Sequence, residues 1–550
     1  MKKIFYLLIF ATLVATTACS DLLNEESKVE VDKNNYMNDA SEAESVLLGV
    51  YRAMVSDGLY GYNLSMLFTI STDIAQCEGS SATNFREIPA NAFNTTNASV
   101  QSTWQSLYAA VYCANDFLET IGKKKASFSD ADKALAEIYI AEAKALRALY
   151  YFELVRWFGN IALMQTTADS YKEPKSFVQA PAASVYEFIE KDLTEAAAAL
   201  PWSIEDSARK NSSFRFSRGA ALGLLAKVYA TWAGYPVLDT SKWQKAAQTA
   251  ALVVNSGKHS LNPSFENVWY NTCNGIWYPQ ESLIEVSFYA SAITGTASED
   301  PAGRIGKWNG VIANAINGVR GRNAGNYKVV YTFIEDFASK NDPRYELSIA
   351  NYKYVGTNKT YFSSVDISQS ATDAKNWQVS TPAKWDTEKY VQSGNYLINA
   401  DKSNVNWYIL RYSDVLLLYA EALNEWKGAP TDEALAAVNM VRRRGFGVDM
   451  NTANAAVDIP NSLTHEEFRQ AIRKERAYEL CFEGHRRQDL IRWGIYYETI
   501  VSTAQKLFNW NSSANYVSVQ YTTKNKHELF PIPQRDMDLM SQFKQNTGWK

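Results

Sequence analysis

The sequence predicts a mainly α-helical protein in which helical hairpins form a scaffold and long irregular loops project from it. The first observation is that apolar residues recur at helical spacing in segments far apart in the chain. One such stripe, at positions i, i+3, i+4, i+7, i+8 and i+11, consists of Ala221, Leu224, Leu225, Val228, Tyr229 and Trp232. The second observation is that two long stretches between the helical segments lack this periodicity.

The helical segments follow one another along most of the chain. A second stripe lies within residues 412–423, and a third, rich in alanine, lies within residues 138–155. The same spacing predicts helices near residues 41–55, 100–120, 184–200, 243–255, 431–444, 464–483 and 486–500. The breaks between them are indicated by Gly159, Gly234-Tyr235-Pro236, Gly445 and Gly484.

The composition of the stripes favours paired helices. Small residues mixed with large aromatic ones let two helices approach closely, as in tetratricopeptide-type arrays. A regular array of that type would show a strict period of roughly 34 residues, and the sequence has no such period. We therefore predict degenerate tetratricopeptide-type helical hairpins.

Two irregular stretches separate the helical blocks. Residues 58–97 are rich in Asn, Ser and Thr, and residues 263–400 mix Gly, Asn and aromatic residues with short β-like runs at 283–288 and 328–333. Loops of this length inside a compact protein are usually functional or disordered, and rigid frames commonly carry binding residues on loops. After a leader at 1–18, we expect an N-terminal helical-repeat part at 19–262, an irregular ligand-binding region at 263–400 and a C-terminal helical part at 401–550.

The N-terminus has the pattern of an export signal. Two lysines precede an apolar run at residues 4–14, and small residues follow before Cys19. The run is too short for a membrane-spanning helix, which needs roughly 20 apolar residues. The pattern V-A-T-T-A-C resembles a bacterial lipobox, which predicts that Cys19 is acylated and becomes the mature N-terminus, tethered to a membrane. Plain secretory cleavage after Ala18 is the alternative.

Composition and charge restrict the classes of function. The 550 residues carry a formal net charge of -4, and 46% of them are hydrophobic, as in an ordinary globular protein. The negative charge argues against a nucleic-acid partner. The dense basic run at 442–444 ends a predicted helix, where cations complement the helix dipole. Four cysteines after Cys19 lack metal-like spacing and leave open one or two disulfides or free thiols: Cys77, Cys113, Cys273 and Cys481.

Catalytic and cofactor motifs are missing from the sequence. His465-Glu466-Glu467 begins like the zinc motif H-E-x-x-H, but the second histidine is absent, and Thr464 with Glu467 forms a capping box at a helix start instead. The sequence has no G-x-S-x-G elbow, P-loop, EF-hand loop or G-x-G-x-x-G motif. We therefore expect no catalysis, no cofactor and no metal ligands. A hydrolase built on two distant carboxylates stays an open alternative.

Three acidic residues share one face of a predicted helix. Glu475, Glu479 and Glu483 are spaced i, i+4 and i+8, and carboxylates at this spacing repel one another unless cations oppose them. One interpretation is an acid/base centre. We favour the other, an ion-pair network that fixes how two helices meet near Gly484. The cations nearest in sequence are Arg476, Arg486, Arg487 and Arg492.

Several long motifs carry a family resemblance. The segment ERAYELCFEGHRRQDLIRWG at 475–494 resembles the signature of SusD/RagB-type outer-membrane lipoproteins of Bacteroidetes. The segment YILRYSDVLLLYAEALN at 408–424 is similar to a second hallmark of that family. Further matches, which extend the resemblance over nearly the whole mature chain, lie at 151–163, 184–200, 218–230 and 528–549.

The resemblance implies a fold and a role. Proteins of this family combine tetratricopeptide-type hairpins with an irregular ligand-binding half. They sit on the cell surface over a TonB-dependent transporter of SusC type and capture oligosaccharides, or in some branches peptides, for import without catalysis. The acidic stretch after Cys19, with Ser20, Asp21, Glu25 and Glu26, resembles the signal for the outer face of the outer membrane. We therefore expect a surface-exposed glycan-binding lipoprotein. The alternatives are a peptide-binding relative, a surface glycoside hydrolase and a structural lid with negligible ligand affinity.

Ligand contacts vary within the family, so candidate residues must follow from chemistry. A sugar ring has an apolar face and a polar rim, and it favours an exposed aromatic plane beside amides, carboxylates or arginine. The loops offer this pattern at Trp308-Asn309, at Trp277-Tyr278 near Trp269-Tyr270 with Asn271 and Asn274, at Trp385-Asp386, and at Asp73 with Phe85-Arg86. For each aromatic residue, packing of the loop onto the scaffold is the alternative. Helical patterns assign four other tryptophans to the core: Trp157, Trp232, Trp243 and Trp493.

Overall fold

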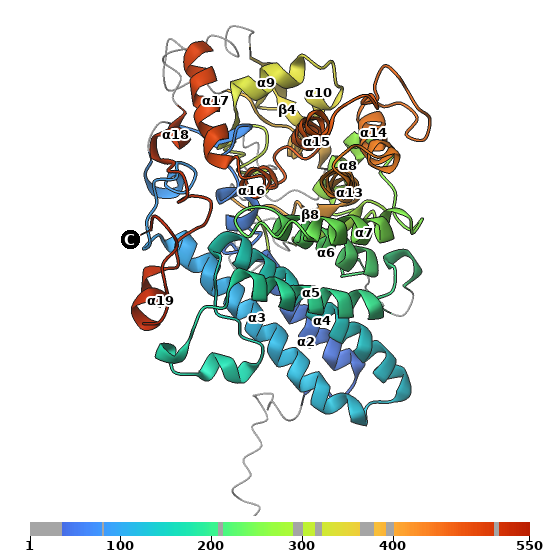
Figure 1. The fold of residues 1–550 in the computed structure, drawn as a ribbon, viewed down its shortest axis with the longest axis vertical. Helices are drawn as coiled ribbons and strands as arrows, with labels where there is room; N and C mark the ends of the chain where they lie inside the picture. The colour runs from blue at the N-terminus through green and yellow to red at the C-terminus, as the bar shows by residue number, and fades with distance from the viewer. Residues whose placement is uncertain are drawn as a thin grey trace, which may run out of the picture.

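The computed structural model is mainly α-helical with small two-stranded sheets, which confirms the predicted fold class (Figure 1). The predicted leader and Cys19 lie outside the residues that the structure describes. The described residues are 36–79, 82–206, 209, 213–289, 301–313, 322–362, 379–391, 401–510 and 516–549.

Six helices of the N-terminal half form the lower part of the molecule in Figure 1. They are α2 (Ala40–Arg52), α3 (Ala98–Lys124), α4 (Asp130–Phe158), α5 (Ala182–Ala199), α6 (Arg218–Ala233) and α7 (Lys242–Val254). From α3 onward, each helix packs against the helix that follows it in the sequence. This nearest-neighbour packing is the arrangement of a helical-hairpin array.

The long helix α4 illustrates why these residues form the scaffold. The Ser129 hydroxyl accepts a hydrogen bond from the Asp132 N–H and caps the helix start. At the other end, Gly159 adopts a φ of 71° and its N–H donates to the Val155 carbonyl at 2.9 Å. The alanine stripe within 138–155 is buried from Ala141 onward, so α3 and α5 approach α4 closely on its alanine-rich surface.

The C-terminal half returns to this scaffold. Helix α13 (Tyr412–Lys427) packs against α6 and α7, and α14 (Asp432–Gly445) and α15 (His465–Glu479) pack against α13. The single helix predicted at 486–500 is wrong. The chain forms α16 (Arg486–Arg492) and α17 (Tyr496–Trp510) instead, because Gly494 between them has a φ of 69°. Two short helices complete this half: α18 (Val517–Tyr521) and α19 (Gln534–Leu539).

The predicted irregular region contains short elements. Among its described residues, the helices are α8 (Phe265–Asn274), α9 (Tyr331–Ala338), α10 (Arg344–Ser348) and α12 (Thr387–Tyr390). Its strands, together with two from outside it, pair antiparallel as β1 (Ala75–Cys77) with β3 (Tyr327–Val329), β2 (Ser282–Val286) with β8 (Trp407–Arg411), β4 (Ile349–Ala350) with β7 (Thr381–Pro382), and β5 (Tyr352–Val355) with β6 (Asn358–Tyr361).

Of the two β-like runs predicted from sequence, one forms a strand over most of its length and the other only at its start. The run at 283–288 contains most of β2, so that prediction is confirmed. The run at 328–333 is strand only at its start, and α9 begins at Tyr331. Phe333, Ile334 and Phe337 are buried, and their i, i+1, i+4 spacing places them on one helix face, which overrides the β propensity of the valines before them.

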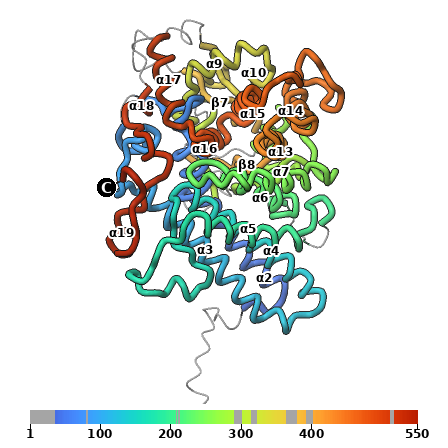
Figure 2. The backbone as a smooth tube through the Cα atoms, in the orientation of Figure 1, coloured from blue at the N-terminus to red at the C-terminus, as the bar shows by residue number. Residues whose placement is uncertain are grey.

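The N-terminal loop at 58–97 lies against the C-terminal part of the chain, as the adjacent blue and red segments near α18 show in Figure 2. The hydroxyls of Ser71 and Ser518 are 3.0 Å apart, and the Asn91 amide donates to the Tyr496 hydroxyl at 2.9 Å. The loop is therefore fixed by side chains more than 400 positions away in sequence.

The four cysteines of the body are free thiols in the structure: Cys77, Cys113, Cys273 and Cys481. The sequence left open either one or two disulfides or free thiols, and the structure has free thiols. Within the described ranges, no helix is both long enough and apolar enough to span a bilayer.

Candidate functional site

Three aromatic side chains from separate segments meet at one place, and we call them the aromatic cluster: Tyr62, Phe85 and Trp308. The Trp308 ring meets the Tyr62 ring at 5.1 Å and the Phe85 ring at 5.2 Å between centroids, both edge-on. Tyr62 precedes a π-helical turn (Asn63–Leu67), and Phe85 lies in a 3-10 turn (Asn84–Arg86). All three side chains are partly exposed.

The turn that carries Trp308 is shaped by its neighbours. Gly306 adopts a φ of 78°, and its N–H donates to the Asn309 side-chain oxygen at 2.7 Å. A Cβ at Gly310 would lie 2.6 Å from the carbonyl oxygen of Trp385, so only glycine fits there. The Trp308 carbonyl accepts from the Tyr327 N–H at 3.1 Å, which ties the turn to β3.

Two arginines flank the aromatic cluster. The Arg304 guanidinium lies 5.0 Å from the Tyr62 ring centroid and 5.6 Å from that of Trp308, and the Arg86 guanidinium lies 4.3 Å from the Phe85 ring centroid. These are cation–π distances. Planar hydrogen-bond donors thus lie over rings of the aromatic cluster, and the combination suits a ligand that has an apolar part and oxygen atoms.

Arg304 is held in place by an acidic partner. Asp57 accepts from Arg304 at 3.0 Å and from Lys402 at 2.6 Å. Burial on its own would raise the pKa of Asp57, but the hydrogen bonds and charges of these two cations lower it below the usual value. The carboxylate therefore stays ionised at neutral pH and fixes the guanidinium over the rings.

An apolar depression adjoins the cluster. It encloses about 260 Å³ of empty space, the solvent at its mouth included, and the aromatic cluster forms part of its lining with Met66, Leu67, Ile70 and Cys77. Pockets that enclose a whole small ligand have roughly 300–1,000 Å³. Only about 20 Å³ of the depression is space that water-sized molecules can occupy, far below that range, so a ligand at the aromatic cluster would lie over the surface.

The structure brings together some of the residues predicted from sequence. Trp308, Phe85 and Arg86 are in one place, although residues 85 and 308 are far apart in the chain. Asn309 is adjacent but fully buried, so its prediction as a ligand contact is wrong: its amide oxygen holds the turn instead. Tyr62 and Arg304 were missed. Each follows a glycine, Gly61 and Gly303, which is the same loop signal that identified Trp308.

The other predicted residues lie elsewhere. Asp73 is ion-paired with Arg486 at 2.7 Å. Trp277 and Tyr278 follow α8 and are partly exposed, and the Trp277 ring lies 6.3 Å from that of Phe214. The lining of the depression beside the aromatic cluster includes none of these three residues.

The prediction at Trp385 and its neighbour Trp269 is wrong, because both are core residues. Trp385 is 1% exposed and Trp269 is 0% exposed. The Trp385 ring stacks on Trp407 at 5.2 Å and meets Trp269 edge-on at 5.6 Å, so neither face is free for a sugar. Asp386 is buried as well and accepts hydrogen bonds from the hydroxyls of Tyr352 and Tyr354.

The three glutamates belong to a buried ion-pair network, which confirms the interpretation favoured from sequence. Glu475 and Glu479 lie on α15, whereas Glu483 lies in the turn after it, because the helix predicted at 464–483 ends at Glu479. Glu479 binds Arg344 at 3.0 Å and Arg411 at 3.1 Å, and it also pairs with Arg444. Glu483 binds Lys384 at 2.7 Å and Arg411 at 2.8 Å, and Glu475 binds Arg442 at 2.7 Å. Every glutamate of the trio is at most 2% exposed, so a substrate has no access to them.

The arginines expected from sequence to oppose the three glutamates do not pair with them. The arginines nearest in sequence pair with other acids: Arg476 with Asp414 and Asp489, Arg486 with Asp73, and Arg492 with Glu421 and Asp489. Arg487 donates to Asn91 and to the His527 carbonyl. The cations that pair with the three glutamates come from segments distant in sequence, because those segments pack against the side of α15 that carries Glu475 and Glu479.

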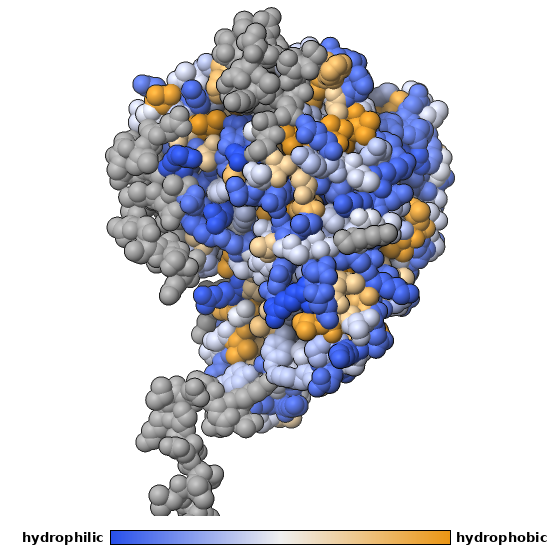
Figure 3. Space-filling view, turned by 90° about the vertical axis from the view of Figure 1, so that its left-hand side faces the viewer, coloured by the Kyte–Doolittle hydropathy of each residue, from blue (hydrophilic) through white to orange (hydrophobic). Residues whose placement is uncertain are grey.

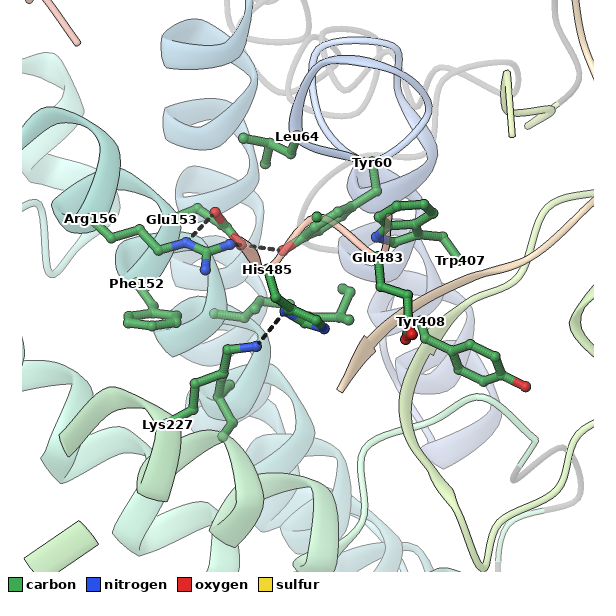
Figure 4. A pocket seen from close by; sticks show the side chains of 14 residues that line it. Tyr60, Leu64, Phe152, Glu153, Arg156, Lys227, Trp407, Tyr408, Glu483 and His485 are labelled. Carbon is green, nitrogen blue, oxygen red and sulfur yellow. Dashed lines mark hydrogen bonds and ion pairs between the residues drawn. The ribbon is translucent and has the colours of Figure 1, made fainter. Parts of the chain in front are cut away.

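A second charged junction lines an internal cavity between α4, α6, β8 and the turn before α16 (Figure 4). The Lys227 ammonium lies 3.0 Å from His485 Nδ1, and the Tyr60 hydroxyl donates to Glu153 at 2.6 Å. Burial, and next the charge of Lys227, lower the pKa of His485 to about 3. His485 is therefore neutral at physiological pH. Its buried position favours a structural role over that of an acid or base.

Across the described ranges, no group of three or more His, Cys, Asp or Glu side chains is placed to hold a metal ion. The aromatic cluster with its two arginines is the candidate binding surface on chemical grounds, and the buried charge networks are structural.

The ion-pair network predicts how stability depends on pH. Burial opposes ionisation of Glu479, but Arg444, Arg411 and Arg344 lower its pKa to about 2, below the usual 4.5. Its contribution to the free energy of unfolding is therefore complete above pH 4.5 and is lost as the pH falls towards 2, by roughly 3 kcal/mol. We expect urea denaturation to show a marked loss of stability between pH 5 and pH 3. A constant free energy of unfolding over that interval would contradict the assignment.

Comparisons with known proteins agree with the fold. Residues 241–549 match the model of the SusD family, and residues 23–230 match a second family model, described as starch-binding associating with outer membrane. A crystal structure of a SusD homologue from Bacteroides thetaiotaomicron superposes with a TM-score of 0.90 at 56% identity, over 96% of this chain and 100% of that one.

Two further relatives match the chain over most of its length. SusD-like protein P2 from Formosa agariphila is 26% identical over 513 residues, covering 89% of this chain and 90% of the relative. Surface glycan-binding protein A from Bacteroides thetaiotaomicron, solved in complex with laminarihexaose, superposes with a TM-score of 0.68 at 21% identity, over 92% of this chain and 99% of that one. The latter likeness is one of fold.

Proposed function

The chain belongs to the SusD family, and on this premise we propose that it is a cell-surface glycan-binding lipoprotein of the outer membrane. It captures oligosaccharides or polysaccharide and delivers them to a TonB-dependent transporter of SusC type, without catalysis of its own. Residues 19–262 and 401–550 supply the scaffold in this proposal. Residues 263–400 supply part of the ligand surface, and the loop at 58–97 supplies the rest.

The observation that carries the proposal is the aromatic cluster with Arg86 and Arg304 at its border. Partly exposed rings offer the apolar faces that sugar C–H groups pack against, and the guanidinium groups offer donors to ring hydroxyls. The buried state of the charge networks supports a binder over an enzyme, because their carboxylates are paired with buried cations and are closed to a substrate. A relative of the same fold has been solved with laminarihexaose, which makes β-glucans a reasonable first probe.

Affinity gel electrophoresis of a soluble protein comprising residues 20–550 tests the proposal. The gels contain laminarin, starch, xylan, mannan or polygalacturonate, and a gel without polysaccharide gives the reference mobility. We expect retardation by at least one glycan. Uniform mobility in all gels would contradict glycan capture, and titration with peptides would then test the peptide-binding alternative. Chromatography after overnight incubation with the retained glycan should show no shortened product, since such a product would indicate hydrolysis.

The proposed anchor is tested at Cys19. Cys19→Ala should move the full-length protein from the membrane fraction to the soluble fraction, because a multiply acylated cysteine is the only attachment that the proposal contains. Fractionation and immunoblotting after an alkaline wash measure this. Cys113→Ala, at an exposed free thiol of the body, is the matched control and should stay with the membrane. Retention of Cys19→Ala after the wash would contradict the anchor.

A further inference from the structure

A wide groove runs between α9, α15 and α17, in the upper half of the molecule in Figure 1. It contains about 1690 Å³ of empty space, the solvent at its mouth included, and the Asp73–Arg486 ion pair lies in its wall. None of its lining residues lines the depression beside the aromatic cluster. The groove is therefore a separate candidate site. About 780 Å³ of it is space that water-sized molecules can occupy, which lies within the roughly 300–1,000 Å³ of pockets that hold small ligands.

The face of α17 that borders the groove is polar. Thr499, Ser502, Thr503 and Lys506 all line the groove, and their i, i+3, i+4 and i+7 spacing places them in one row along the helix. An amphipathic helix normally presents such a row to bulk solvent. Here the row faces α9 and α15 across an open space, so its hydroxyls are placed to bond to a molecule lying in the groove.

Two stacked aromatic rings lie at the end of α17. The Trp510 ring lines the groove and stacks on Tyr331 at 4.0 Å between centroids, with 17° between the planes. Both side chains are partly exposed and pack against the small apolar core that contains Val330 and Leu507. The stack holds the indole plane in one orientation, which gives a flat apolar surface beside the row of hydroxyls.

Arg473 of α15 differs from the other arginines at this junction. Arg476, Arg486 and Arg492 each pair with a carboxylate, whereas Arg473 forms no ion pair within the described part of the chain, and its Nε is buried without an acceptor. Its guanidinium lies 4.9 Å from the Trp493 ring centroid. A partly desolvated donor without an acceptor is unfavourable, and oxygen atoms of a ligand in the groove would satisfy it.

The charges around the groove balance. The cations that line it are Arg473, Lys474, Arg486 and Lys506, and the anions are Asp73, Glu335, Asp336 and Glu498. A balanced lining favours a neutral ligand over an acidic one. The face that carries α17 and α18, turned to the viewer in Figure 3, is mainly hydrophilic where it is not covered in grey, with hydrophobic residues in small separate areas. Such a surface is poorly suited to a large apolar partner.

We propose that this groove is a second carbohydrate-binding site, which takes a neutral oligosaccharide segment. Trp510 stacks on the apolar face of one sugar ring, and Arg473 with the α17 hydroxyls bonds to the hydroxyl rim. This inference rests on the proposed glycan-binding function and adds a second contact for one polysaccharide chain. Two sites on one protein raise the apparent affinity for a polymer above that of either site, because the second contact forms intramolecularly.

The test uses affinity gel electrophoresis with the same neutral polysaccharides, laminarin, starch, xylan and mannan. Trp510→Ala and Arg473→Gln should each raise the apparent dissociation constant by about three- to tenfold, the loss expected for one stacking or hydrogen-bonding contact. Phe508→Ala is the matched control: it removes an aromatic ring of the same helix that is 57% exposed and does not line the groove. Arg473→Gln breaks no ion pair, so we expect this variant to stay folded. It therefore tests the groove even if Trp510→Ala lowers the melting temperature.

The outcomes separate the two proposals. If a polysaccharide retards the wild type and both groove variants migrate like Phe508→Ala, the second site is refuted and glycan capture stands. If Trp308→Ala keeps a residual retardation that Trp308→Ala/Trp510→Ala loses, the second site is supported. A wild type that no neutral polysaccharide retards would refute the groove as a site for neutral glycans, whatever polygalacturonate does.

Discussion

Glu479→Ala should lower the free energy of unfolding by about 3–5 kcal/mol, the usual result of removing one partner from a buried ion pair. Glu479 is 0% exposed and faces Arg344, Arg411 and Arg444, which are also fully or almost fully buried. Alanine would leave these cations close together without their shared anion, and it would leave a cavity as well. Urea denaturation followed by circular dichroism measures the change.

Glu466→Ala is the matched control for that experiment. Glu466 lies in the first turn of the same helix, where it pairs with Arg469, and its side chain is 58% exposed. Exposed pairs contribute about 0–1 kcal/mol, so we expect a small loss of stability. Glycan affinity in the folded fraction of Glu479→Ala should equal that of the wild type. Loss of affinity with unchanged stability would place the network in the binding site and contradict the structural interpretation.

Trp308→Ala should lower the affinity for the retained glycan by about 2 kcal/mol or more, roughly thirtyfold, as for a central aromatic contact in an interface. The ring supports Tyr62 and Phe85 on two sides, so its removal takes away one platform and releases the other two. Titration calorimetry with an oligosaccharide prepared from the retained polysaccharide measures the effect.

Trp277→Ala controls for the general loss of an aromatic side chain from a loop. Trp277 is partly exposed, as Trp308 is, but it lies beside Phe214 and not beside the cluster. We expect its affinity to match the wild type. The reverse result, with binding lost in Trp277→Ala and kept in Trp308→Ala, would move the site to the segment after α8. Melting curves of both variants show whether each is folded at the temperature of titration.

The helical scaffold could be predicted from sequence because the apolar pattern that identifies each helix lies within that helix. The stripe within 221–232 and the alanine stripe within 138–155 repeat with the period of a helix, and both fall inside helices, α6 and α4. The helix face shared by Glu475 and Glu479 could also be predicted from their spacing, whereas Glu483 lies beyond the end of α15. Their partners could not be predicted, because Arg344, Arg411 and Arg444 come from three separate segments and nothing in the spacing links these segments.

The candidate site was predictable only in part, for the same physical reason. A tryptophan between glycines indicated an aromatic residue on a tight turn, and Trp308 has that place. Trp385 also stands in an irregular segment beside an acid, but its ring stacks on Trp407, a contact that local sequence cannot reveal. Tyr62 and Arg304 became candidates only when the fold brought the loop at 58–97 next to the turn that carries Trp308.

Hydrogen–deuterium exchange of the backbone amides tests whether a glycan is captured at the aromatic cluster. The protein comprising residues 20–550 is labelled with and without an oligosaccharide of the retained glycan. We expect slower exchange of backbone amides in residues 84–90 and 304–310 when the oligosaccharide is present. Unchanged exchange in both segments, together with slower exchange at residues 275–280, would contradict it.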